Sequence, residues 1–119
     1  MRSSPSVLAA LLFWGACGTD AEPAPELDPA CATSTLTYDN FGGPFMLDWC
    51  RGCHSSGQPD GMRQGAPLGV DFDDHPHVLQ WSTEIEALAT GTMPSMPPAA
   101  GPSVEERAML AEWVHCGAR

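Results

Sequence analysis

The sequence predicts an all-α domain of three to four helices. Three stretches, at about residues 43–51, 81–90 and 103–117, combine apolar side chains at helical spacing with residues that favour helix ends. No run of alternating β-branched side chains indicates a strand. At 119 residues the chain has room for one domain.

The first helix is expected from about Gly43 to Arg51. Phe41, Phe45 and Trp49 recur every four residues, so they form one apolar stripe that a core would cover. Pro44 suits the first turn of this helix, because its missing N–H would have no partner there.

The second helix is expected from Trp81 to Thr90. Ser82 or Thr83 is expected near its cap, since their hydroxyls accept hydrogen bonds from the free N–H groups of a first turn. Gly91 follows the last helical residue and is expected to end the helix.

The last helix is expected to open at Ser103. Ser103 and Glu106 form a capping box, in which each side chain accepts a bond from the other residue's backbone N–H. Gly117 is expected to close the helix. An apolar stripe on this helix is expected to pack across the first helix; it consists of Leu110, Trp113 and Val114.

The N-terminus is expected to be an export signal, residues 1–16. One Arg near the start is followed by an apolar run from Val7 to Trp14, far shorter than the roughly 20 residues that cross a bilayer. The segment ends WGAC, which resembles the lipobox of bacterial lipoproteins. The resemblance implies lipidation of Cys17; ordinary cleavage nearby is the alternative.

Residues 18–30 are expected to be a disordered linker. This stretch is rich in proline and acidic residues and has hardly any large apolar side chain to bury. The folded domain is therefore expected at 31–119. The signal predicts an exported protein. Gly18, directly after Cys17, resembles the residue found in lipoproteins sent to the outer membrane, so the protein is expected in the periplasm or anchored to the outer membrane of a Gram-negative bacterium.

The charge balance excludes some partners. The chain has 15 Asp and Glu against five Arg, and it has no Lys. Such an acidic chain is not expected to bind nucleic acid or anionic lipid headgroups, and a basic protein patch suits it better. Plain solubility explains the same composition.

The five cysteines divide into three groups. With Cys17 assigned to the lipid, Cys31 and Cys116 lie at the two ends of the folded unit and are expected to form a disulfide. Closing so long a loop stabilises a chain by on the order of 4 kcal/mol in the chain-entropy model. Cys50 and Cys53 remain.

These two cysteines belong to the stretch WCRGCHSS. A redox dithiol would need the strand and helix pattern of a thioredoxin-like fold, and a zinc site would need a second pair of ligands. Covalent haem needs two thiols for its vinyl groups and an adjacent imidazole for its iron, which Cys50, Cys53 and His54 supply. The spacing suits a helix on which the two cysteines share a face.

The order of these features is similar to that of small class I monohaem cytochromes c. CRGCH is followed by MPP and then by a helix that carries EER, Leu110, Trp113 and Gly117. The resemblance covers about residues 38–119. It implies an all-helical fold wrapped around one covalent haem c. It also implies that the backbone carbonyl of Pro67 accepts the His54 N–H and orients the ring.

The second axial ligand is expected to be a methionine. Met96 begins the MPP triplet, and its distance from the last helix resembles that in the family. Pro97 and Pro98 would also stiffen the chain after it. Met93 is the alternative ligand, and a histidine such as His75 or His77 is a further one. His115 is expected to have no ligand role.

The predicted function is one-electron transfer between redox proteins, without enzymatic activity. A haem-based ligand sensor with a replaceable sixth ligand is the alternative. Three carboxylates near His75 are interpreted as a solvated acidic loop rather than a calcium site, because their spacing fits no known calcium loop. They are Asp71, Asp73 and Asp74.

Overall fold

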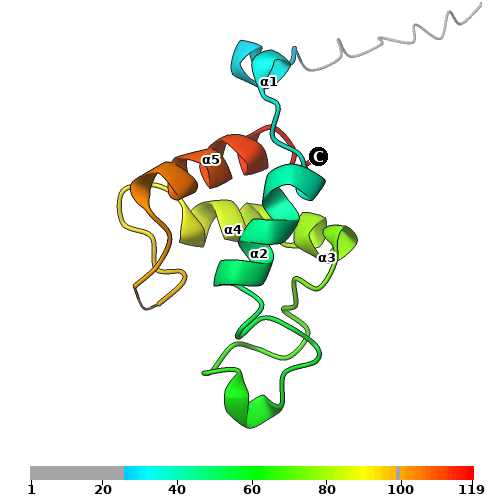
Figure 1. Cartoon of the computed structure of the whole chain (residues 1–119), viewed down its shortest axis with the longest axis vertical. Helices are drawn as coiled ribbons and strands as arrows, with labels where there is room; N and C mark the ends of the chain where they lie inside the picture. The colour runs from blue at the N-terminus through cyan, green and yellow to red at the C-terminus, as the bar shows by residue number, and fades with distance from the viewer. Residues whose placement is uncertain (1–25, 99) are drawn as a thin grey trace, which may run out of the picture.

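The computed structural model describes residues 26–98 and 100–119, and within these ranges it contains helices and no strands (Figure 1). The predicted all-α class is therefore confirmed. The helical segments are α1 (Pro29–Thr33), the π-helical turn η1 (Tyr38–Gly42), α2 (Gly43–Trp49), the 3-10 turn η2 (Asp60–Met62), α3 (His75–Gln80), α4 (Ser82–Ala89) and α5 (Val104–His115).

The signal peptide, Cys17 and the linker up to residue 25 lie outside the described residues. Among the helices that are described, none combines the length and the apolar character needed to cross a bilayer. Helix α1 begins at Pro29, just before the predicted boundary of the folded unit. Asp28 caps it by accepting the Ala30 N–H at 2.9 Å.

Helix α2 begins at Gly43 with proline in its first turn, as predicted. The turn η1 precedes it without a break, because Thr37 and Asn40 form a reciprocal capping box at its start. The helix ends at Trp49, two residues earlier than expected. Cys50 and Cys53 therefore lie in the turn after the helix and not on one helical face, which corrects the sequence interpretation.

Helix α5 packs against α4 and crosses the start of α2 (Figure 1). Trp113 is fully buried, and a Cβ on Gly42 would lie 2.2 Å from its ring, so only glycine allows this close approach. Phe41 meets the same indole edge to face, with centroids 6.0 Å apart. The predicted packing of the last helix on the first is confirmed, as are the Ser103–Glu106 capping box and the turn at Gly117.

Helix α3 was not predicted. Asp74 accepts the His77 N–H at 3.0 Å and proline lies in the first turn, so both start signals were present in the sequence. Helix α4 follows almost directly and confirms the helix predicted at Trp81 to Thr90. Ser82 is its first residue, but Trp81 is the cap and no side chain accepts a hydrogen bond there. The Trp81 N–H still bonds the Val78 carbonyl of α3 at 3.2 Å, so the chain hardly leaves the helical conformation before α4 begins.

The disulfide between Cys31 and Cys116 joins α1 to the end of α5, with Cα atoms 5.2 Å apart. This is the pairing expected from the sequence. Two further contacts support the same junction: Arg119 donates to the Cys31 carbonyl at 2.5 Å, and His115 lies 3.0 Å from Asp28. The two ends of the described domain are thus held together.

Candidate functional site

The cysteine–histidine stretch forms one tight turn after α2. The Cys50 carbonyl accepts the Cys53 N–H at 3.1 Å and the His54 N–H at 2.9 Å. All three side chains are half-buried, and neither Cys50 nor Cys53 is in a disulfide. The turn therefore places two thiols and one imidazole close together at the edge of the core.

The His54 ring is oriented by a backbone carbonyl. Its Nδ1 lies 2.9 Å from the Val70 carbonyl oxygen, and since a carbonyl can only accept, Nδ1 carries the proton. In the neutral imidazole the lone pair is then on Nε2, the nitrogen that can bind a metal. Phe72 stacks on the ring at a centroid distance of 4.8 Å. Contacts within the fold therefore set both the tautomer of the neutral ring and its direction.

Pro67 does not have the role that the resemblance implied. Its carbonyl accepts from Arg63 Nη2 at 2.7 Å and from the Val70 N–H at 3.3 Å, while Val70 supplies the carbonyl that meets His54. The reason is a turn at Leu68 and Gly69, in which Gly69 has φ +82°. This turn carries the chain past Pro67 and brings Val70 to the imidazole.

The segment that follows Val70 holds the histidine loop, residues 54–73, closed. The Phe72 N–H donates to the His54 carbonyl at 2.9 Å. The Asp73 carboxylate accepts from the Ser55 hydroxyl at 2.5 Å and from the Ser56 N–H at 2.8 Å. Hydrogen bonds from Ser55, then Ser56, hold the pKa of Asp73 at about 2.

The interpretation of a solvated acidic loop is therefore corrected. Asp71 lies 2.8 Å from Arg63, Asp73 closes the histidine loop, and Asp74 caps α3. Each carboxylate has a structural partner within the fold, which spacing along the chain did not reveal.

Met96 is held by the end of α4, in the methionine loop, residues 90–98. Its N–H donates to the Leu88 carbonyl at 2.9 Å, and its carbonyl accepts from Arg107 of α5 at 2.8 Å. Arg107 also donates to the Ala89 carbonyl at 2.9 Å. Met96 is 37% exposed, whereas Met93 is 91% exposed. The backbone at Met96 is thus fixed on both sides.

The environment of Cys50 is unsuited to a reactive dithiol. Burial raises the pKa of this thiol to about 12, and the nearby charge of Arg107 only partly opposes the effect. Thiol–disulfide chemistry needs the thiolate, which redox dithiols obtain by lowering the pKa. Within residues 26–98 and 100–119, no three His, Cys, Asp or Glu side chains are grouped in a way that could hold a metal ion.

The other three histidines are engaged away from this turn. His75 Nε2 lies 2.6 Å from the Ala118 carbonyl, and its ring stacks on Tyr38. His77 lies 2.6 Å from Asp74, and His115 bonds Asp28. His75 was expected at the surface; it is half-buried and ties α3 to the C-terminus.

Two buried donors lack a hydrogen-bond acceptor among the described residues: Arg51 Nε, whose ion-pair partner Asp73 lies 3.5 Å away, and the indole N–H of Trp81. Trp81 packs on the same core as Trp49 and Cys50, and its indole N–H has no partner among the described residues. A buried N–H without an acceptor is costly and marks a place where a bound group could supply one. The two carboxylates of a haem are acceptors of that kind.

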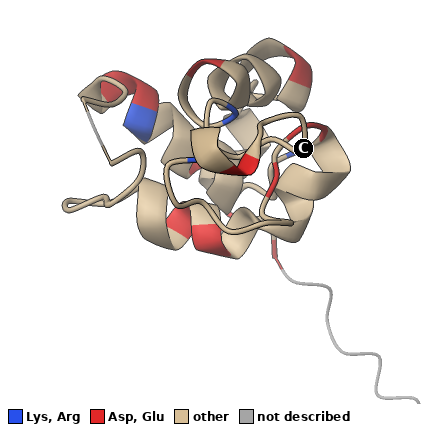
Figure 2. Ribbon diagram, turned by 90° about the horizontal axis from the view of Figure 1, so that it is seen from below, with Lys and Arg blue, Asp and Glu red and all other residues tan. Residues whose placement is uncertain are grey.

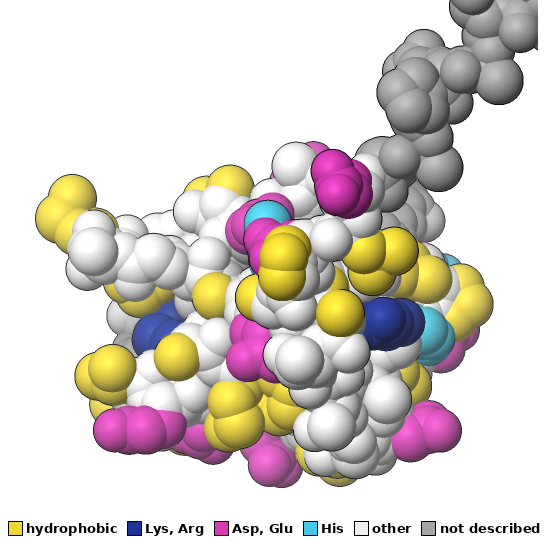
Figure 3. Space-filling view, turned by 90° about the horizontal axis from the view of Figure 1, so that it is seen from above, with side chains coloured by type: hydrophobic (Ala, Val, Ile, Leu, Met, Phe, Trp, Pro, Cys, Tyr) yellow, Lys and Arg dark blue, Asp and Glu magenta, His cyan; other side chains and the backbone are white. Residues whose placement is uncertain are grey.

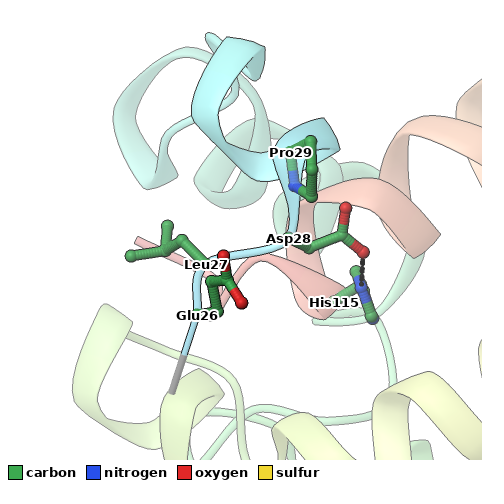
Figure 4. Close-up of a pocket in the computed structure, with 5 residues that line it drawn as sticks. All are labelled: Glu26, Leu27, Asp28, Pro29 and His115. Carbon is green, nitrogen blue, oxygen red and sulfur yellow. Dashed lines mark hydrogen bonds and ion pairs between the residues drawn. The ribbon is translucent and has the colours of Figure 1, made fainter. Parts of the chain in front are cut away.

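Two surface hollows lie elsewhere. Figure 4 shows one at the N-terminal edge of the domain, where Leu27 and Pro29 flank the contact between Asp28 and His115. A second lies between the methionine loop and α5, where Pro94 faces Arg107 and Ala108. Neither includes Cys50, Cys53 or His54.

The exposed charge is mainly negative. Figure 2 shows acidic residues on several helices, and Figure 3 shows acidic side chains along the border of the face in view, with basic ones sparse. Each described arginine is engaged with a carbonyl or a carboxylate; these are Arg51, Arg63, Arg107 and Arg119. Their charge is therefore largely used within the fold.

Comparison of this chain with protein-family models, with curated proteins and with solved structures found no match. Its function has to be argued from the site itself.

Proposed function

We propose that this protein is an exported monohaem cytochrome c that carries single electrons between redox proteins. The observation that carries the proposal is the state of His54. Its Nδ1 is committed to the Val70 carbonyl, its Nε2 lone pair is left for a metal, and two thiols outside any disulfide lie in the same turn.

The residues present fit a covalent haem c. Cys50 and Cys53 would hold it through two thioethers, each formed by adding S–H across one vinyl group. His54 would bind the iron through Nε2. Trp81 offers a buried N–H that lacks an acceptor. The haem iron would supply the chemistry, which is the gain of one electron from a donor protein and its loss to an acceptor.

Met96 is the residue we propose as the second axial ligand. Its backbone is fixed by Leu88 and Arg107, whereas Met93 is almost fully exposed. A thioether favours ferrous iron and raises the reduction potential, which suits an electron carrier. The cytochrome c-like arrangement of the helices around one haem belongs to this same proposal.

Export and membrane attachment complete the proposal. The signal-like residues 1–16 and the lipobox-like end at Cys17 support secretion to the periplasm with a lipid anchor. The acidic exterior and the inward use of the arginines support docking to a basic patch on each redox partner. Fractionation of cells that make Cys17→Ser checks the anchor: release of the variant supports it, and identical soluble behaviour of wild type and variant contradicts it.

The decisive experiment is a visible spectrum of the full chain made in cells that attach haem to secreted proteins. We expect sharp ferrous bands that carbon monoxide does not change, with haem that stays on the denatured polypeptide. A Cys50→Ser, Cys53→Ser double variant serves as the control and should lose the covalent haem. Bands that respond to carbon monoxide would favour a ligand sensor, and absence of bands would exclude both functions.

A further inference from the structure

Arg63 is the one fully buried charged residue among those described, at 2% exposure. It lies directly after η2, in the middle of the histidine loop. A buried cation costs several kcal/mol of free energy unless it is paired and its hydrogen bonds are satisfied. The loop around Arg63 therefore has to supply an ion-pair partner and hydrogen-bond acceptors for the guanidinium.

The guanidinium is satisfied entirely from within this loop. Its Nη1 donates to the Ser55 carbonyl at 2.5 Å and lies 2.8 Å from the Asp71 carboxylate. Its Nη2 donates to the Pro67 carbonyl at 2.7 Å, and its Nε to the Ala66 carbonyl at 3.3 Å. The planar group thus gathers backbone from both ends of the loop at one point.

One of these contacts reaches the candidate iron ligand. The Val70 carbonyl accepts from Arg63 Nη2 at 3.3 Å as well as from His54 Nδ1 at 2.9 Å. A carbonyl oxygen has two lone pairs, so both bonds can form together. The acceptor that orients His54 is therefore itself held in place by the buried guanidinium.

We propose that Arg63 is the positioning residue for His54: it fixes the Val70 carbonyl against Nδ1–H and so keeps Nε2 directed and electron-rich. The expected effect on the reduction potential of the iron rests on the proposed function. The expected effect on the orientation of the His54 ring rests on the described contacts alone. A hydrogen bond at Nδ1 raises the basicity of the ligating nitrogen, and its loss favours the ferrous state.

The test replaces Arg63 by lysine, which keeps the positive charge near Asp71 but lacks the fork that reaches the carbonyls. We expect the His54 Nδ1 proton to exchange with solvent about tenfold faster, by NMR of the reduced full-length protein, and the reduction potential to rise. Asp71→Asn leaves Arg63 in place but loosens it, and should change both readouts in the same direction by less. If Arg63→Lys does not fold, the same two measurements on Asp71→Asn decide the question.

Arg51→Gln is the matched control. Arg51 lies in the turn between Cys50 and Cys53, and its Nε is 3.5 Å from the Asp73 carboxylate. It makes no described contact with Val70. Its loss should leave the exchange rate of the Nδ1 proton unchanged. If Arg63→Lys lowers stability while the exchange rate and the potential stay at wild-type values, Arg63 is only structural and the proposal fails. If the chain takes up no haem, the proposed function fails, and the exchange rate in the haem-free chain still decides the role of Arg63.

Discussion

The two loops that carry the candidate iron ligands are held in different ways. The histidine loop is built around the buried Arg63, which contacts the Asp71 carboxylate and four backbone carbonyls. Asp73 accepts from Ser55 across the two ends of the loop. The methionine loop is attached to the open end of α4. Its main bonds run from Met96 to the Leu88 carbonyl and to the half-exposed Arg107.

The difference follows from the groups that each loop uses. The last carbonyls of a helix have no partner within the helix, so the carbonyl of the exposed Leu88 can accept from the loop or from water. A buried guanidinium and its partners have no such exchange available. The histidine loop is therefore expected to form in the chain alone, while the methionine loop is expected to depend more on the proposed bond from Met96 to iron.

The largest expected effect comes from removing that bond. Met96→Leu should abolish the weak far-red band of ferric iron bonded to a thioether. It should also lower the reduction potential by on the order of 0.1 V, within the about 0.8 V range that axial ligands span. Met93→Leu, the matched control, should change neither, because its side chain is exposed. The reverse pattern would assign the ligand to Met93, and loss in neither would return attention to a histidine such as His75.

A smaller effect is expected from the carboxylate that closes the histidine loop. Asp73→Asn should lower the free energy of unfolding by about 2 kcal/mol, since hydrogen bonds to a charged group are lost. Chemical denaturation measures this. Asp60→Asn, which removes an exposed carboxylate with no described bond, is the control and should have little effect.

The same carboxylate predicts the acid limit of stability. The pKa of Asp73 falls from 3.8 to about 2 on folding, so its contribution is complete above about pH 4 and is lost as the pH falls through 2. In Asp73→Asn the free energy of unfolding should depend less on pH between about pH 4 and pH 2. An unchanged slope would show that these hydrogen bonds contribute nothing in solution.

The smallest effect is expected at the methionine loop. Arg107→Gln removes a donor from the exposed Met96 carbonyl and from the part-buried Ala89 carbonyl, so we expect the free energy of unfolding to fall by about 1 kcal/mol. Added ligands that compete with the thioether should bind about fivefold more tightly, by spectral titration. Arg119→Gln removes a cation at the far end of the domain; it is the control for ligand binding and should leave the affinity for added ligands unchanged. If Arg107→Gln lowers the free energy of unfolding more than Asp73→Asn does, the methionine loop is not the more weakly held of the two loops.

The sequence by itself determined the features that depend on neighbouring residues. The capping box at Ser103 and the proline in the first turn of α2 were predicted correctly as local patterns. Such patterns can be read because a cap and its helix lie within a few residues, so their hydrogen bonds hardly depend on the rest of the fold.

The partners that meet across the loop were decided only by the tertiary structure. The carbonyl that orients His54 comes from Val70 and not from Pro67, because a turn at Gly69 shifts the chain beyond the expected residue. In the same way Arg63, which looks like an ordinary surface residue in the sequence, is buried by the loop that folds around it. Loop closure selects one set of long-range hydrogen bonds from many that the same residues allow, and burial then decides their strength.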